Sequence, residues 1–95
     1  MIYAEAALRD MERIVEHLEE GAPGLPEIAV GRVTEAVSLL GNHPMMGRPV
    51  EQGLRQLVIS RGRTGYVALY RYLEREDVVL ILALRHQREV GVYNL

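Results

Sequence analysis

The sequence predicts an α+β domain in which an N-terminal helical hairpin packs on a three- to four-stranded antiparallel sheet. In residues 7–40, apolar side chains recur at three- and four-residue steps, which is typical of amphipathic helices. After residue 53 the apolar period falls to two, which is typical of strands. Because a chain of 95 residues has room for one hydrophobic core, we expect a single domain spanning residues 1–95.

The first helix follows a short apolar segment, residues 2–4, that we interpret as an edge strand. Charged residues, Asp10 among them, are expected on the solvent face of this helix, and Gly21 ends it. The expected buried stripe consists of Ala7, Leu8, Met11, Ile14, Val15 and Leu18.

The second helix begins after the turn "GAPGLP", because Pro26 suits the first turn of a helix. Gly41 and Asn42 mark its end. A turn this short predicts that the two helices are antiparallel neighbours. The expected buried stripe of this helix is Ala29, Val33, Ala36, Val37 and Leu40.

Three strands are predicted after a loop over residues 42–53, at residues 54–60, 66–73 and 78–85. The connections "RGRTG" and "ERED" suit antiparallel hairpins. On the middle strand, alternation separates Tyr66, Ala68, Tyr70 and Tyr72 from Val67, Leu69, Arg71 and Leu73. On the last strand, it separates Val78, Leu80, Leu82, Leu84 and His86 from Val79, Ile81, Ala83, Arg85 and Gln87. Since both faces of the last strand are apolar, we expect it to be central, or covered on its second face by a partner.

Composition excludes several classes of site. The chain has no Cys, so it forms no disulfide or thiolate metal site, and a reducing cytoplasm is the expected location. The longest apolar run, residues 78–84, is far shorter than the roughly 20 residues of a membrane-spanning helix, and we expect no membrane association. No carboxylate stands at ligand spacing to any of the three His residues, and no glycine-rich phosphate loop follows a strand, so we expect no metal and no cofactor.

The charge is distributed unevenly. The net charge is −2, yet residues 1–40 carry eight acids and three Arg, whereas residues 41–95 carry eight Arg and five acids. Residues 52–73 contain four Arg and no acid. This stretch is either a solvated strand face or a surface for an anionic partner.

Arg, His and Tyr at strand positions are the remaining candidates for chemistry. Such a set could cleave RNA without a metal, since Arg neutralises the scissile phosphate, His or Tyr moves protons, and Tyr stacks on a base. Arg and His at strand ends are, however, more often solvated or ion-paired than catalytic. The candidates for catalysis are Arg71, Arg85, His86, Arg88 and Tyr93.

The order of the segments resembles a known family. A helical hairpin is followed by "HPMMGRP", "GLRQLVI", "GYVALYRY", a short acidic turn and "VVLILALRHQRE". This pattern is similar to the RelE/ParE superfamily, the toxins of bacterial type II toxin–antitoxin systems, often labelled plasmid stabilisation proteins, and it extends from about residue 2 to residue 93. The resemblance implies a cytoplasmic toxin that is neutralised by a cognate antitoxin and that reaches operator DNA only through that antitoxin.

The resemblance leaves three activities to weigh. RelE-like members cut mRNA on the ribosome without a metal and carry a basic residue directly after the Gly-Tyr of the middle strand, where this chain has Val67 after Gly65 and Tyr66. ParE-like members inhibit DNA gyrase and need no catalytic residue. An isoelectric point near 5.9 disfavours docking to ribosomal RNA, so the ParE-like activity is favoured. The third reading is an inactive remnant that only binds its antitoxin and assists operon repression.

Whichever activity holds, we expect one polar cluster at an edge of the sheet to meet the target or the antitoxin. Arg71 and Arg85 are at odd-numbered strand positions and His86 is at an even-numbered one, so strand alternation does not let all three point the same way. The members of the predicted cluster are Arg55, Arg61, Arg71, Arg85, His86 and Arg88.

Overall fold

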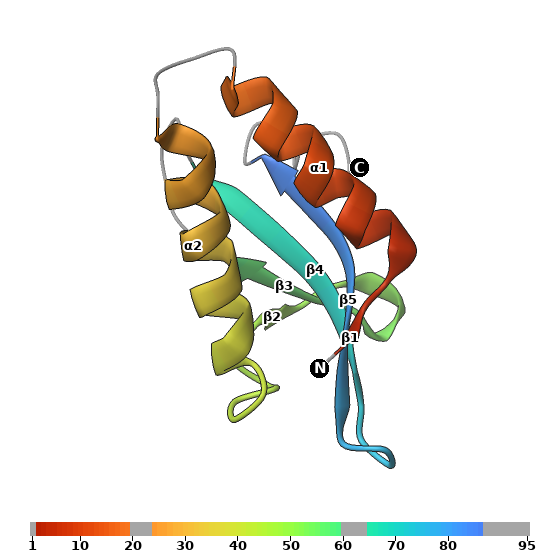
Figure 1. Cartoon of the computed structure of the whole chain (residues 1–95). Coiled ribbons are helices and arrows are strands. Elements are labelled where there is room, and N and C mark those ends of the chain that lie inside the picture. Colours follow the sequence, from red (N-terminus) through yellow and green to blue (C-terminus); the bar gives the residue numbers. More distant parts are fainter. Residues whose placement is uncertain (1, 20–23, 60–64, 87–95) are drawn as a thin grey trace.

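The computed structural model describes residues 2–19, 24–59 and 65–86, which form two helices on one face of a five-stranded sheet (Figure 1). The helices α1 and α2 lie side by side and run in opposite directions, as the short turn predicts (Figure 1). The elements in chain order are β1 (Ile2–Tyr3), α1 (Glu5–Glu19), α2 (Leu25–Leu39), β2 (Arg48–Pro49), a 3₁₀ turn (Glu51–Gly53), β3 (Arg55–Val58), β4 (Tyr66–Leu73) and β5 (Val78–His86).

The strand order is β1-β5-β4-β3-β2. The predicted α+β class and the helical hairpin are confirmed, but the sheet has five strands and is mixed, because β1 pairs in parallel with β5. After β1, the chain forms both helices over one face of the sheet. It then forms β3, β4 and β5, each antiparallel to the strand before it, and β5 ends up beside β1. The strand β2 falls inside the predicted loop; two residues, one of them a proline, are too few to produce a period.

Among the α1 side chains that the structure describes, which exclude Leu18, the buried face differs from the prediction at two positions. Ala7 and Ile14 are buried as expected, whereas Leu8 is half exposed. Asp10, expected on the solvent face, is only 5% exposed. On α2 the predicted stripe is confirmed, since Ala29, Val33, Val37 and Leu40 are all buried and Ala36 is partly buried.

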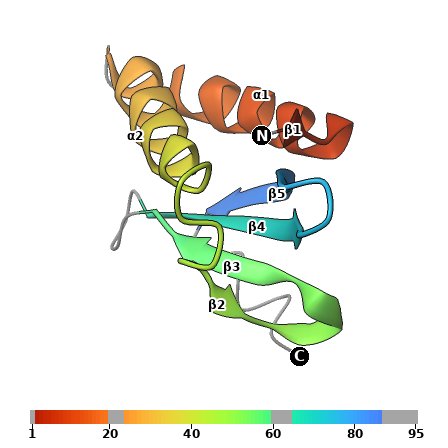
Figure 2. The same ribbon diagram turned by 90° about the horizontal axis from the view of Figure 1, so that it is seen from below.

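The core lies between the helices and the near face of β4 and β5 (Figure 2). The predicted faces of β4 are confirmed. Those of β5 are wrong beyond residue 81, because a β-bulge interrupts the ladder. Leu69 pairs with Ala83 and Tyr70 with Ile81, so Leu82 is an additional residue that reverses the alternation after it. The helix-facing cross-strand pairs are therefore Tyr72 with Val79, Tyr70 with Ile81, Ala68 with Leu84 and Tyr66 with His86.

Candidate functional site

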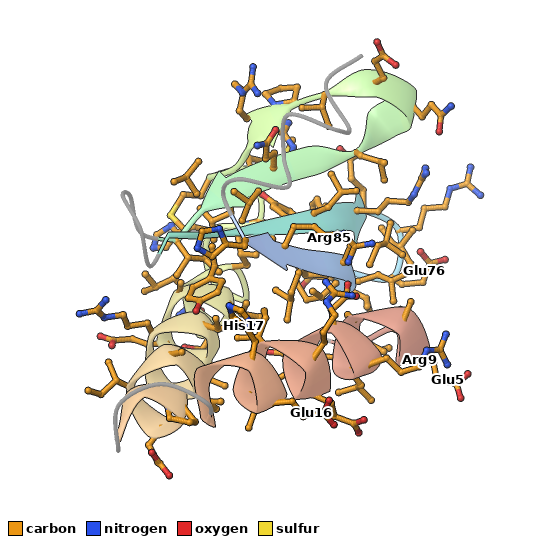
Figure 3. All side chains as sticks on the ribbon, turned by 90° about the horizontal axis from the view of Figure 1, so that it is seen from above. Glu5, Arg9, Glu16, His17, Glu76 and Arg85 are labelled. Carbon is orange, nitrogen blue, oxygen red and sulfur yellow. The ribbon has the colours of Figure 1, made fainter. Side chains whose placement is uncertain are left out.

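The end of β5 is joined to α1 through a buried carboxylate. Asp10 Oδ2 accepts a hydrogen bond of 2.9 Å from the backbone N–H of Leu84 and forms an ion pair with the Arg85 guanidinium. Arg85 belongs to β5 and is labelled in Figure 3. Arg13, one turn further along α1, donates to Asp10 Oδ1 at 3.1 Å. One carboxylate thus receives two cations and one backbone amide, which compensates the cost of burying its charge.

Arg85 also contacts the strand that carries it. Its Nη1 donates to the carbonyl oxygen of Leu84 at 3.2 Å. Leu84 stands opposite Ala68, and its N–H and C=O point away from β4, as at every second position of an antiparallel ladder. Side chains of Asp10 and Arg85 therefore satisfy both backbone groups of Leu84; we call this arrangement the Asp10–Arg85 clamp.

His86 lies on the helix-facing side of the sheet, opposite Tyr66. Their rings meet edge to face, with centroids 5.6 Å apart and planes at 87°. Burial raises the pKa of the Tyr66 phenol above its ordinary value, and the nearby Arg32 lowers it by a smaller amount. Tyr66 is almost fully enclosed, so this pair contributes to packing at the end of the core.

Arg55 donates hydrogen bonds to the loop between α2 and β2. It stands opposite Tyr70 on the helix-facing side, and its Nη1 donates to the carbonyl oxygens of Gly47 at 2.8 Å and Met45 at 3.2 Å. The Tyr70 hydroxyl donates to the carbonyl oxygen of Pro44 at 2.7 Å and accepts from Gly47 N–H at 2.8 Å. The four contacts fasten this loop to the sheet, although its Met45 side chain is 53% exposed.

The opposite face of the sheet, which the helices do not cover, carries Arg71. Arg71 pairs with Leu80, is partly buried, and lies near Gly53, where a Cβ would stand 3.6 Å from its Nη1. Around it this face is apolar; its partly buried members are Leu69, Leu73, Val78, Leu80 and Ala83.

The structure distributes the predicted polar cluster over both faces of the sheet. Arg71 and Arg85 share the helix-free face of the ladder, whereas Arg55 and His86 belong to the helix-facing side. His86 lies on the other face from Arg71, as the sequence predicts, but this separation depends on the bulge at Leu82. Arg85 and His86 are on opposite faces because they are adjacent in the strand. The predicted residues Arg61, Arg88 and Tyr93 lie outside the residues that the structure describes.

Sequence reasoning missed two residues that organise this region, Asp10 and Tyr70. A signal for Asp10 existed, because it lies three residues after Ala7 and four before Ile14, which is the spacing of the buried stripe. Tyr70 carried no comparable signal, since its hydroxyl partners are more than 20 residues away in the chain.

The described part of the chain contains neither a cluster of metal-ligand side chains nor a membrane-spanning helix. No three His, Asp or Glu side chains in residues 2–19, 24–59 and 65–86 converge to hold a metal ion. In the same ranges no helix combines the length and apolar character needed to cross a bilayer.

Comparison with known proteins establishes the family. The family model of the ParE toxin of type II toxin–antitoxin systems, parDE, matches residues 1–91. A curated protein from Caulobacter vibrioides, "Toxin RelE3", is 32% identical over 83 residues, which cover 87% of this chain and 88% of that protein. Membership of this family implies a cognate antitoxin as partner. The chain therefore belongs to the RelE/ParE superfamily of type II toxins and matches its ParE branch over almost its whole length.

Proposed function

We propose that this toxin acts as ParE-like members do, by binding and inhibiting DNA gyrase, and that its antitoxin holds it inactive. The observation that carries the proposal is the placement of the candidate catalytic residues. Arg85 is ion-paired with Asp10, and His86 packs against Tyr66 on the other side of the sheet from Arg71. A metal-free ribonuclease needs its cations and proton carriers on one surface around a phosphate, and these three do not share one.

Charge supports the same proposal. The whole chain has a net charge of −2, and α1 presents exposed acids such as Glu12 and Glu16. Affinity for ribosomal RNA depends chiefly on Lys and Arg contacts to phosphate, which an acidic protein supplies poorly. A protein target such as gyrase imposes no such requirement.

The helix-free face offers a contact surface for a protein. Val58 is exposed on this face, Leu69 and Leu80 are partly buried there, and Arg71 supplies a cation. An apolar surface that includes an Arg suits a segment that carries apolar and acidic residues. We propose that the antitoxin covers this face and that gyrase contacts include Arg71.

The second candidate is a RelE-like ribosome-dependent mRNA endonuclease. The observation that favours it is the name of the Caulobacter relative, "Toxin RelE3", at 32% identity. In this reading Arg71, Arg85 and His86, with Arg88 and Tyr93, carry the chemistry, and the Asp10 pair must open to release Arg85.

Two assays on one preparation distinguish the candidates. Purified toxin is added to gyrase with relaxed plasmid, and separately to translating ribosomes whose mRNA is mapped by primer extension. We expect supercoiling to be inhibited and mRNA to remain intact. When toxin is first mixed with its antitoxin, the inhibition of supercoiling should disappear and mRNA should still remain intact. Cleaved codons in the ribosomal A site with unimpaired supercoiling would reverse the assignment, and inactivity in both assays would favour the remnant.

A paired substitution tests the contact role of the last strand. We expect Arg85→Ala with Arg88→Ala to weaken gyrase inhibition when the two proteins are compared at equal folded concentration. The matched control is Arg9→Ala with Arg75→Ala, which removes two exposed arginines from α1 and from the turn between β4 and β5. Equal inhibition by both double variants would restrict Arg85 and Arg88 to a structural role.

A further inference from the structure

Among residues 2–19, 24–59 and 65–86, no strand pairs with the outer edge of β5 beyond Ile81. Strand β1 pairs with β5 only at Leu80 and Ile81, and the last backbone bond between these segments runs from Ala4 N–H to Ile81 O at 2.8 Å. Past that point β5 continues to His86, where the structure gives it β4 as its one strand neighbour. Unpaired N–H and C=O groups along a strand edge favour pairing with another chain.

At the opposite edge of the sheet, the strand β2 itself limits pairing with another chain. Strand β2 has two residues, and one of them, Pro49, has no N–H to donate. The edge of β5 has no proline and is apolar, with Leu82, Ala83 and Leu84 in succession. A different feature must therefore prevent the β5 edge from pairing with another chain.

We propose that the Asp10–Arg85 clamp closes this edge by replacing a neighbouring strand, and that it thereby prevents the toxin from pairing with a second copy of itself. The Asp10 carboxylate takes the position of a strand carbonyl at Leu84 N–H, and the Arg85 guanidinium takes the position of a strand amide at Leu84 C=O. The ion pair between Asp10 and Arg85 locks the two halves together. Asp10 is buried on the helix face that packs on β5, so its position is set by the fold.

A second copy is the partner that this edge fits. Both outward backbone groups belong to one residue, Leu84. In an antiparallel pair related by a two-fold axis, Leu84 of each copy stands opposite Leu84 of the other, and each N–H reaches the other's C=O. Removing the clamp therefore leaves a self-complementary edge.

The test uses the purified toxin, in which Asp10→Ala removes the clamp and Asp10→Asn retains an oxygen that accepts from Leu84 N–H. Amide hydrogen exchange by NMR reports the edge directly, and light scattering after gel filtration reports the mass. Val37→Ala is the control, because it weakens the core at α2 and leaves Asp10 and Arg85 unchanged. At low concentration, we expect the Leu84 amide of Asp10→Ala to lose about 100-fold more protection than the central amides of β4, and we expect no such difference in the other two variants. With rising concentration, Asp10→Ala should dimerise and regain that protection.

Three results would overturn the proposal. One is a monomeric Asp10→Ala protein at every concentration; another is dimerisation of Val37→Ala or Asp10→Asn to the same extent. The third concerns the wild type and applies even where Asp10→Ala does not fold. The Leu84 amide of the wild-type toxin must then be as protected as the central amides of β4, and free exchange there contradicts the clamp.

Discussion

The Tyr70 hydroxyl on β4 and the backbone of Gly47 are in direct contact across the sheet surface. The hydroxyl accepts a hydrogen bond of 2.8 Å from Gly47 N–H and donates one of 2.7 Å to the carbonyl of Pro44. A Cβ at position 47 would stand 2.6 Å from both Cε1 and the hydroxyl oxygen of Tyr70. The loop therefore approaches the ring at a distance that only glycine permits, and this contact shapes the exposed His43–Met46 surface, which borders an open hollow of about 590 Å³.

Gly47→Ala should lower the free energy of unfolding by about 1–3 kcal/mol, because the added methyl group overlaps the fully buried Tyr70 ring. Gly31→Ala is the matched control: the position lies inside α2 with open space around it, and alanine there should raise stability by about 0.5–1 kcal/mol. Urea unfolding of both variants measures the difference. Equal effects of the same sign would contradict the close approach.

Tyr70→Phe should cost about 1–3 kcal/mol, because Gly47 N–H and Pro44 C=O lose their partner in a site with little access to water. The control is Tyr72→Phe, whose hydroxyl donates to Asp77 at an exposed position and should cost no more than about 0.5 kcal/mol. Chemical denaturation measures both. A similar loss in the two variants would show that the loop contact adds nothing to an exposed hydrogen bond.

Asp10→Ala should destabilise the protein by about 3–5 kcal/mol, because it leaves the partly buried Arg85 and the Leu84 amide without the carboxylate. Arg13→Ala removes the outer member of the same network, whose side chain is 51% exposed, and should cost about 0–1 kcal/mol. Thermal and urea unfolding test the contrast. If both losses are below 1 kcal/mol, as expected of surface pairs, the network is not a stabilising element.

Alkaline pH should destabilise the fold in part through Tyr66. Its folded pKa lies above the ordinary value of 10.0, so between pH 10 and the folded pKa the unfolded chain loses a proton that the folded chain retains. Stability from this group is complete below pH 10 and is lost as the pH rises through the folded pKa. Tyr66→Phe should flatten the dependence of unfolding free energy on pH in this range. An unchanged slope would assign the alkaline loss to other groups, such as Tyr3, whose pKa is also raised by burial.

Arg71→Ala should weaken gyrase inhibition by about 10-fold or more, since a charge-assisted contact contributes about 1.5–3 kcal/mol. The unfolding free energy should change little, because Arg71 is on the helix-free face. Arg75→Ala, at the exposed turn between β4 and β5, is the control for charge alone. If both variants lose inhibition equally, the effect of Arg71 comes from the net charge of the protein and not from a specific contact.

Local pattern was sufficient to predict most of the secondary structure. The apolar period alone placed both helices and β3, β4 and β5 within a few residues of their observed bounds. These elements follow from residues close in sequence, since side chains at fixed helical or strand spacing must share a face to be buried. The family was likewise evident from the order of short segments and is confirmed by the match over residues 1–91.

The tertiary structure alone decided which side chains meet at the candidate site. A bulge at Leu82 reverses which face of the sheet Leu84, Arg85 and His86 occupy. Because the apolar run is continuous, its sequence pattern gives no sign of one additional residue. From the helical pattern, Asp10 is expected at the surface. It is buried because α1 packs on β5, where Leu84, 74 residues later in the chain, donates a hydrogen bond to its carboxylate. The sequence by itself determined the elements and the family; the contacts of Arg85 depended on register and long-range packing, which are set between distant segments.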